Sequence, residues 1–100
     1  MNINVNSEAG KLNLGLVGRL DTSTAGMLED VLKDKIESVN EIIMDFSSLD
    51  YISSAGLRVI LGTQKQINAK KGKLIIKNVN QIVMEIFEIT GFVDILTIEQ

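Results

Sequence analysis

Short apolar segments typical of strands alternate along this chain with longer segments whose apolar residues recur at helical spacing. The first segment alternates Ile3 and Val5 with asparagines, and the second, residues 12–18, begins by alternating leucine with asparagine and glycine. Residues 8–10 between these segments suit a hairpin turn. We therefore expect two neighbouring strands, paired antiparallel, at the start of the sheet.

A dense cluster of residue types that cap helices, residues 21–24, precedes the first segment with helical spacing. We expect the first helix there, with the apolar positions among residues 28–36 turned inward. Residues 41–46 follow with a continuous apolar run, which is typical of a strand buried on both faces. Residues 47–50 then predict a turn, and residues 51–52 resume an extended segment.

The second expected helix begins at Ser54, where the apolar period becomes helical again. Two lysines and a glycine at residues 70–72 form its stop, because cations favour the last turn and glycine ends helices. Residues 73–77 then predict a short apolar strand. The residues of this helix expected to turn inward are Leu57, Ile60, Leu61 and Ile67.

The third expected helix is capped by Asn78 or Asn80 and ends at Gly91, and residues 93–98 predict the last strand. The residues of this helix expected to turn inward are Ile82, Val83, Ile86 and Phe87. The resulting order is β-β-α-β-α-β-α-β. It predicts one α/β domain over residues 1–100, with helices packed on a mostly parallel central sheet that has an antiparallel edge pair.

The composition excludes several kinds of chemistry. The chain contains no cysteine and no histidine, so it offers no disulfide, no thiol nucleophile, no imidazole base and no common zinc site. We therefore expect no catalytic residue, no metal and no cofactor. The net charge of −3 and the lack of any basic cluster longer than Lys70–Lys71 argue against direct contact with nucleic acid.

The sequence also lacks the features of a membrane protein. Its first residues do not form a signal peptide, and no apolar run approaches the roughly 20 residues that cross a bilayer. These features predict a cytoplasmic protein that does not contact a membrane. The small size and the lack of a broad apolar surface stripe predict a monomer.

Binding sites in open α/β sheets lie beyond the carboxyl ends of the strands. Four polar segments are expected there, residues 18–21, 45–48, 53–56 and 78–80. The third has two serines followed by two residues with almost no side chain. A serine at a helix start commonly serves only as the N-cap. The alternative is an exposed hydroxyl that another protein's active site can reach, because a helix N-terminus tolerates a phosphate.

Residues 45–61, DFSSLDYISSAGLRVIL, resemble the signature of bacterial anti-sigma-factor antagonists, the small STAS-domain proteins. Upstream, residues 18–21 (GRLD) followed by residues 24–25 (TA) are similar to a second hallmark of that family. The expected order of strands and helices also resembles the STAS fold along essentially the whole chain.

This resemblance implies a phosphorylation switch. The unphosphorylated form of such a protein binds an anti-sigma factor, itself a serine kinase, and thereby frees the sigma factor. The kinase then phosphorylates its antagonist on a serine at the start of the second helix, and the complex falls apart. A serine phosphatase restores the binding form.

The resemblance assigns the acceptor to Ser54, with Ser53 as the second choice. Many relatives have Asp immediately before the acceptor and Ser or Thr after it, where this chain has Ser53 and Ala55. Asp21 and Asp45 match acidic or polar positions that line the same end of the sheet in relatives. The resemblance implies that they orient the serine hydroxyl or contact the kinase. The alternative is that Asp21 caps the first helix and Asp45 merely ends a strand.

The outward side of the second helix is expected to dock the partner. Helical geometry gathers small and weakly charged residues there, next to Ser54. Gly56 either supports this site or only lets the helix lie close to a strand. The residues expected on the docking side are Ala55, Arg58, Val59, Gly62, Gln66 and Ala69.

Other functions fit the sequence less well. An independent enzyme is disfavoured because the chain has no histidine, no cysteine and no phosphate-binding glycine motif. A response-regulator receiver would need an acidic pair after its first strand, which is missing, although Asp45 fits its acceptor. Within the STAS family, the alternative is an unphosphorylated scaffold or adaptor in a larger signalling or lipid-transport assembly.

Overall fold

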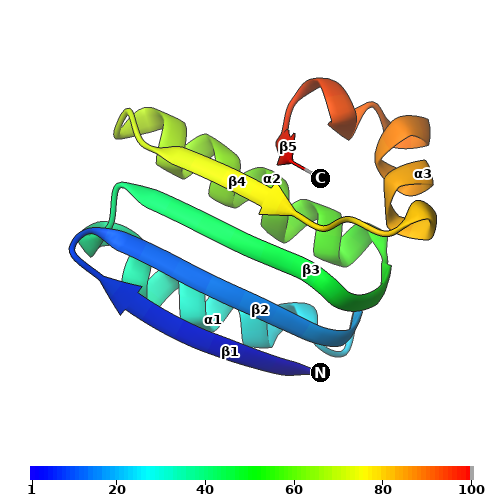
Figure 1. The fold of residues 1–100 in the computed structure, drawn as a ribbon, viewed down its shortest axis with the longest axis horizontal. Coiled ribbons are helices and arrows are strands. Elements are labelled where there is room, and N and C mark those ends of the chain that lie inside the picture. Colours follow the sequence, from blue (N-terminus) through cyan, green and yellow to red (C-terminus); the bar gives the residue numbers. More distant parts are fainter. Residues whose placement is uncertain (100) are drawn as a thin grey trace.

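The computed structural model describes residues 1–99 and contains a five-stranded sheet whose strand order repeats the order of the chain (Figure 1). The first two strands pair antiparallel, and the remaining neighbours pair parallel. The α/β class, the mixed sheet and the expected order of elements are therefore confirmed. The strands are β1 (Asn2–Glu8), β2 (Lys11–Leu20), β3 (Glu41–Ile52), β4 (Lys73–Lys77) and β5 (Thr97–Glu99). The helices are α1 (Ala25–Lys35), α2 (Ser54–Ala69) and α3 (Gln81–Thr90), with short 3-10 helices η1 (Ile36–Ser38) and η2 (Phe92–Asp94).

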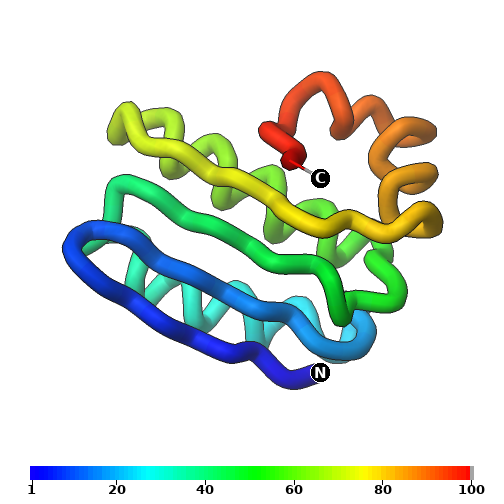
Figure 2. Tube along the Cα trace, viewed as in Figure 1, coloured from blue at the N-terminus to red at the C-terminus, as the bar shows by residue number. Residues whose placement is uncertain are grey.

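Helices α1 and α2 cover one face of the sheet, and the opposite face is open (Figures 1 and 2). Crossovers between parallel strands are right-handed. Because each crossover here leads to the next strand in the same direction across the sheet, the crossover helices lie on the same face. Burial alternates accordingly along β3, where Ile42 and Met44 are buried and Ile43 is partly exposed. The expectation of a strand buried on both faces is wrong.

The β1–β2 hairpin turns at Ala9 and Gly10, whose φ angles of 42° and 82° are both positive. Turns with two positive φ angles match the natural twist of paired strands. The expected hairpin turn is therefore confirmed. Strand β2 runs on to Leu20, two residues beyond its expected end at residue 18, and so reaches the start of α2.

The turn expected at residues 47–50 is wrong, because β3 continues through it as a strand with two irregularities. The register with β2 shifts once opposite Leu16 and again before Arg19, so β3 carries an extra residue at each place. At the first, the Asp45 carboxylate accepts the Ser47 N–H at 2.9 Å. The turn-forming residues thus bend and bulge the strand instead of ending it (Figure 2).

Helix α3 buries a narrower stripe than the sequence predicts. Val83 and Phe87 are buried, and the Phe87 ring lies 6.3 Å from that of Phe46 on β3. Ile82, expected inward, is 59% exposed, because α3 meets the sheet along one side only. Of the two expected caps, Asn80 is the one that accepts the Val83 N–H.

Two further expectations need correction. Leu61 of α2 is partly exposed and is not among the apolar residues that form or line the core. The last strand begins at Thr97, not at residue 93, because the chain first coils through η2 after Gly91, whose φ is 80°. Val93 and Ile95 are consequently exposed.

The first turn of α2 lies unusually close to the ends of β2 and β3. A Cβ at Gly56 would stand 2.7 Å from Leu20 Cγ and 2.9 Å from Ile52 Cγ1. Both neighbours are buried, so neither can move aside without disturbing the core. The absence of a side chain at Gly56 is what allows this approach.

We expect Gly56→Ala to lower the free energy of unfolding by about 1–3 kcal/mol, because the added methyl group must displace buried side chains. Urea unfolding followed by circular dichroism measures the change. Gly62→Ala is the matched control, since it lies in the same helix and a Cβ there meets no atom within 4 Å. That control should stabilise by up to about 1 kcal/mol, and an equal response of the two variants would contradict the prediction.

Candidate functional site

Two adjacent serines at the start of α2 face different surroundings. Ser53 ends the extended segment and occupies the N-cap position, yet its side chain makes no cap hydrogen bond. Its hydroxyl oxygen is buried and has no hydrogen-bond partner within residues 1–99. Ser54, the first residue of the helix, is exposed. Only the Ser54 hydroxyl is accessible from outside the molecule in this conformation.

The backbone around these serines is fixed from two sides. The Ser53 N–H donates to the Leu20 carbonyl at 2.9 Å, which ties the start of α2 to the end of β2. The Ser53 carbonyl accepts the Leu57 N–H at 2.9 Å and closes the first helical turn. The N–H groups of residues 54–56 precede this first helical bond, and unpaired N–H groups at a helix start attract negative charge.

Asp21 follows Leu20 directly and shapes the turn that leads into α1. Its carboxylate accepts hydrogen bonds from the Ser23 hydroxyl at 2.8 Å and the Ser23 N–H at 3.0 Å. These bonds hold the pKa of Asp21 below its usual range. Arg19 Nε lies 3.7 Å from the same carboxylate, and its guanidinium stacks 4.5 Å above the Tyr51 ring. The N-cap residue of α1 is Thr24, not Asp21.

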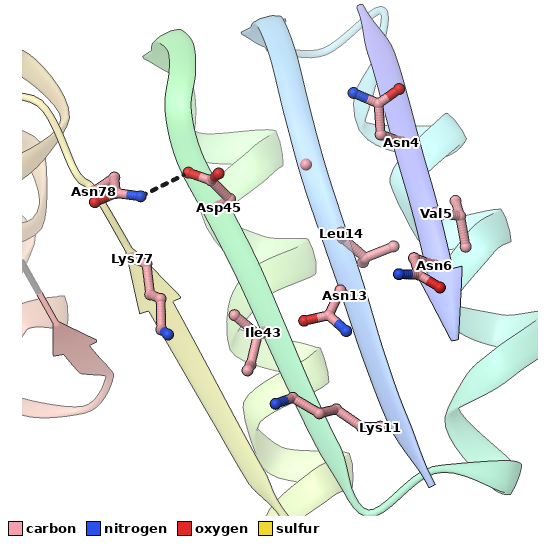
Figure 3. A pocket seen from close by; sticks show the side chains of 11 residues that line it. Asn4, Val5, Asn6, Lys11, Asn13, Leu14, Ile43, Asp45, Lys77 and Asn78 are labelled. Carbon is pink, nitrogen blue, oxygen red and sulfur yellow. Dashed lines mark hydrogen bonds between the residues drawn. The ribbon is translucent and has the colours of Figure 1, made fainter. Parts of the chain in front are cut away.

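Asp45 lies on the open face of the sheet, and its hydrogen bonds join it to residues other than Ser53 and Ser54. The Asn78 side-chain amide donates to it at 3.1 Å (Figure 3). The Ser47 N–H donates to the same carboxylate at 2.9 Å. The Asn78 amide is the main cause that holds the pKa of Asp45 below its usual range, followed by the Ser47 N–H. No hydrogen bond within the described residues joins Asp45 to Ser53 or Ser54.

The expected docking side of α2 is only partly free. Arg58, Gly62 and Gln66 are exposed, whereas Ala55 and Val59 are partly buried against the core. A shallow groove of about 120 Å³ runs between this side and α1. Residues from both helices line it, including Glu29, Lys33, Arg58, Gly62 and Gln66.

The contribution of α1 to this surface could not be predicted from the sequence. Glu29 and Lys33 are four residues apart, a spacing typical of a pair that stabilises an isolated helix, and nothing in that pattern indicates a groove. Leu61 also contributes to this surface, although the helical period predicts that it turns inward. It stands seven residues after Ser54 and therefore on the same side of α2. Its partial exposure adds an apolar side chain to the surface next to Ser54.

We expect the pKa of the Asp45 carboxyl group to lie below the reference value of about 3.9, and Asn78→Gly to raise it. Glycine is the matched replacement because φ of Asn78 is 60°. Asn78→Asp should raise the pKa of Asp45 further by like-charge repulsion. Carbon-detected NMR titration measures each value.

The sign of the associated stability change follows from linkage. A carboxyl whose pKa is lowered by folding stabilises the protein above its unfolded-state pKa, and that contribution is lost as pH falls through the folded-state value. Asn78→Gly should therefore weaken the dependence of stability on pH below about pH 4. A wild-type pKa for Asp45 at or above the reference value would contradict this account.

Comparison with known proteins gives the family. The sequence profile of the STAS domain matches residues 2–100. The putative anti-sigma factor antagonist BtrV of Bordetella bronchiseptica is 34% identical over 99 residues, covering 98% of this chain and 85% of that relative. The anti-sigma-B factor antagonist of Bacillus subtilis is 26% identical over 98 residues, covering 98% of this chain and 90% of that relative.

Solved structures agree on the fold. A putative anti-sigma factor antagonist from Thermotoga maritima superposes with a TM-score of 0.91 at 20% identity, covering 98% of this chain and 86% of that one. Unphosphorylated SpoIIAA, an anti-sigma factor antagonist, gives a TM-score of 0.80 at 19% identity, covering 99% of this chain and 88% of that one. The profile match and the curated relatives together show that this chain belongs to the STAS-domain family of anti-sigma factor antagonists.

Proposed function

We propose that this protein is an anti-sigma factor antagonist switched by phosphorylation of Ser54. Its unphosphorylated form binds an anti-sigma factor that is also a serine kinase, and the sigma factor is released. Phosphorylation of Ser54 by that kinase ends the interaction, and a serine phosphatase restores it. The curated relatives that carry the name of antagonist support the first half of this proposal.

The observation that carries the second half is the contrast between the two serines. The Ser54 hydroxyl is exposed at the first position of α2, flanked by Ala55 and Gly56, so a kinase active site can close over it. The Ser53 hydroxyl is buried and would have to turn outward first. This contrast supports Ser54 as the acceptor.

A phosphate on Ser54 would change the charge of the surface without disturbing the core. It adds about −2 charges at pH 7 beside the unpaired N–H groups at the start of α2, which tolerate an anion. The same charge would stand at one end of the surface formed by Arg58, Leu61 and Gly62. A partner that covers this surface would have to desolvate the phosphate, which disfavours the complex.

The proposal also includes where the protein acts and what it does not bind. The protein acts as a cytoplasmic monomer, without catalytic activity of its own and without direct contact with nucleic acid or membrane. Within residues 1–99, no helix is long and apolar enough to span a membrane. The rival function is an adaptor that binds its partner but is never phosphorylated. A phosphorylation assay distinguishes this adaptor from the switched antagonist.

We expect incubation with ATP and the anti-sigma kinase from the same cell to add one phosphate at Ser54. Intact-mass measurement with fragmentation locates the phosphate. Ser54→Ala should abolish the modification and leave partner binding intact, whereas the matched variant Ser53→Ala should still be phosphorylated. A phosphate on Ser53 would overturn the choice of acceptor, and binding without any phosphorylation would favour the unswitched adaptor.

We expect Leu61→Asp to weaken binding of the anti-sigma factor by roughly 100-fold, because an apolar contact is lost and a carboxylate is desolvated. Isothermal titration calorimetry measures the affinity, and circular dichroism checks that the fold is kept. Ile89→Asp is the matched control, since Ile89 is 86% exposed on α3. Equal affinities of the two variants would place the interface away from this side of α2.

A further inference from the structure

The open face of the sheet contains a polar hollow of about 490 Å³ on the side away from α1 and α2 (Figure 3). Strands β1, β2, β3 and β4 all contribute to its lining. Its volume is within the range of small-molecule sites, which is about 300–1,000 Å³. Its lining includes Asn4, Asn6, Asn13, Gly15, Lys11 and Lys77.

Three asparagines face this hollow from adjacent strands. Asn4 pairs with Gly15 and Asn6 pairs with Asn13 in the β1–β2 register, so their side chains gather on one patch of the open face (Figure 3). Asparagine is depleted in strands. None of the three side-chain amides makes a hydrogen bond within the described residues, so each still offers two donors and an acceptor.

Gly15 lines the hollow without a side chain, and neither its φ angle nor its neighbours require a glycine there. Its φ is not positive, and a Cβ would meet only Asn4 atoms at 3.6 and 3.7 Å, which is ordinary contact. Glycine inside a strand costs about 0.5–1 kcal/mol of stability relative to alanine. A glycine inside a strand often marks a β-bulge or the close approach of a ligand, and Gly15 both lines the hollow and lies beside the first irregularity of the β2–β3 pairing.

Two lysines bring positive charge to the lining of the hollow, which also contains the carboxylate of Asp45. Lys11 and Lys77 lie on either side of Ile43 in Figure 3. Lys11 makes no ion pair within residues 1–99, although Glu8 and Glu41 neighbour it in register, and Lys77 has only Glu99 at 4.0 Å. The one carboxylate of the lining, Asp45, already accepts two hydrogen bonds.

We propose that this hollow binds a small phosphorylated polyol, such as a hexose phosphate. The two ammonium groups match the double negative charge of a phosphate monoester. The amides of Asn4, Asn6 and Asn13 match the hydroxyl groups of the sugar, which both donate and accept. Ile43 offers an apolar floor between them. The site is separate from the Ser54 switch, because it occupies the opposite face of the sheet.

Glucose 6-phosphate is the probe for this proposal, with the intact protein labelled with nitrogen-15. We expect saturable shifts of the lining backbone amides and of the side-chain amides of Asn4, Asn6 and Asn13. Glucose and inorganic phosphate, tested separately, should each bind at least about tenfold more weakly because each satisfies half of the lining. The proposal would be overturned if glucose or inorganic phosphate bound as tightly as glucose 6-phosphate. It would also be overturned if no saturable shift occurred up to about 10 mM glucose 6-phosphate.

The decisive variant is Gly15→Val, which fills the hollow and suits a strand. It should abolish the shifts without lowering the unfolding midpoint, and retained binding or a lower midpoint would overturn the role of Gly15. Gly26→Ala is its control, because a Cβ there meets no atom within 4 Å.

The double variant Lys11→Gln, Lys77→Gln should weaken binding of glucose 6-phosphate at least about tenfold, and unchanged binding would overturn the role of the lysines. Ser54→Ala should bind like the wild type.

Discussion

One hydrogen bond, from the Ser53 N–H to the Leu20 carbonyl, joins the end of β2 to the start of α2. It can form only because Gly56 has no side chain to keep the helix away from Leu20. Since the backbone of Ser53 is extended at φ −100° and ψ 177°, its side chain and that of Ser54 point in different directions. The burial of one hydroxyl and the exposure of the other therefore depend on how closely a helix and a strand meet.

The order of the elements could be predicted from the sequence because period and capping are local signals. The hairpin turn at Gly10 and the helix end at Gly91 follow from glycine, which tolerates positive φ. The bulges of β3 could not be predicted, because Ser47 and Asp50 belong equally well to turns and to irregular strands. Whether the bend ends the strand depends on its pairing with β2, which is a long-range contact.

Burial was predicted less well than element type, for a related reason. Within residues 41–46, Ile42, Met44 and Phe46 are buried, whereas the open side carries two carboxylates besides Ile43. The unbroken apolar stretch at residues 42–44 hides this alternation, and the direction of the crossovers leaves the second side open. Leu61 and Ile82 were expected inward because they fit the helical period. The side of each helix that packs against the sheet is narrower than the side on which its apolar residues recur, so both residues stay exposed or partly exposed. The position of Ser54 at the start of α2 could be predicted from the sequence, whereas the placement of Asp45 beside Asn78 depends on the strand register.

A sheet whose strand order repeats the chain order can be assembled in the order in which the chain is made. Each new strand adds to the edge left by the one before it, so no segment must thread between two strands already in place. Pairings between neighbours in sequence also keep loop closures short, which favours rapid folding. Within residues 1–99, the last addition, β5, pairs with β4 over three residues, and this edge is therefore where the native sheet opens at the lowest cost in free energy.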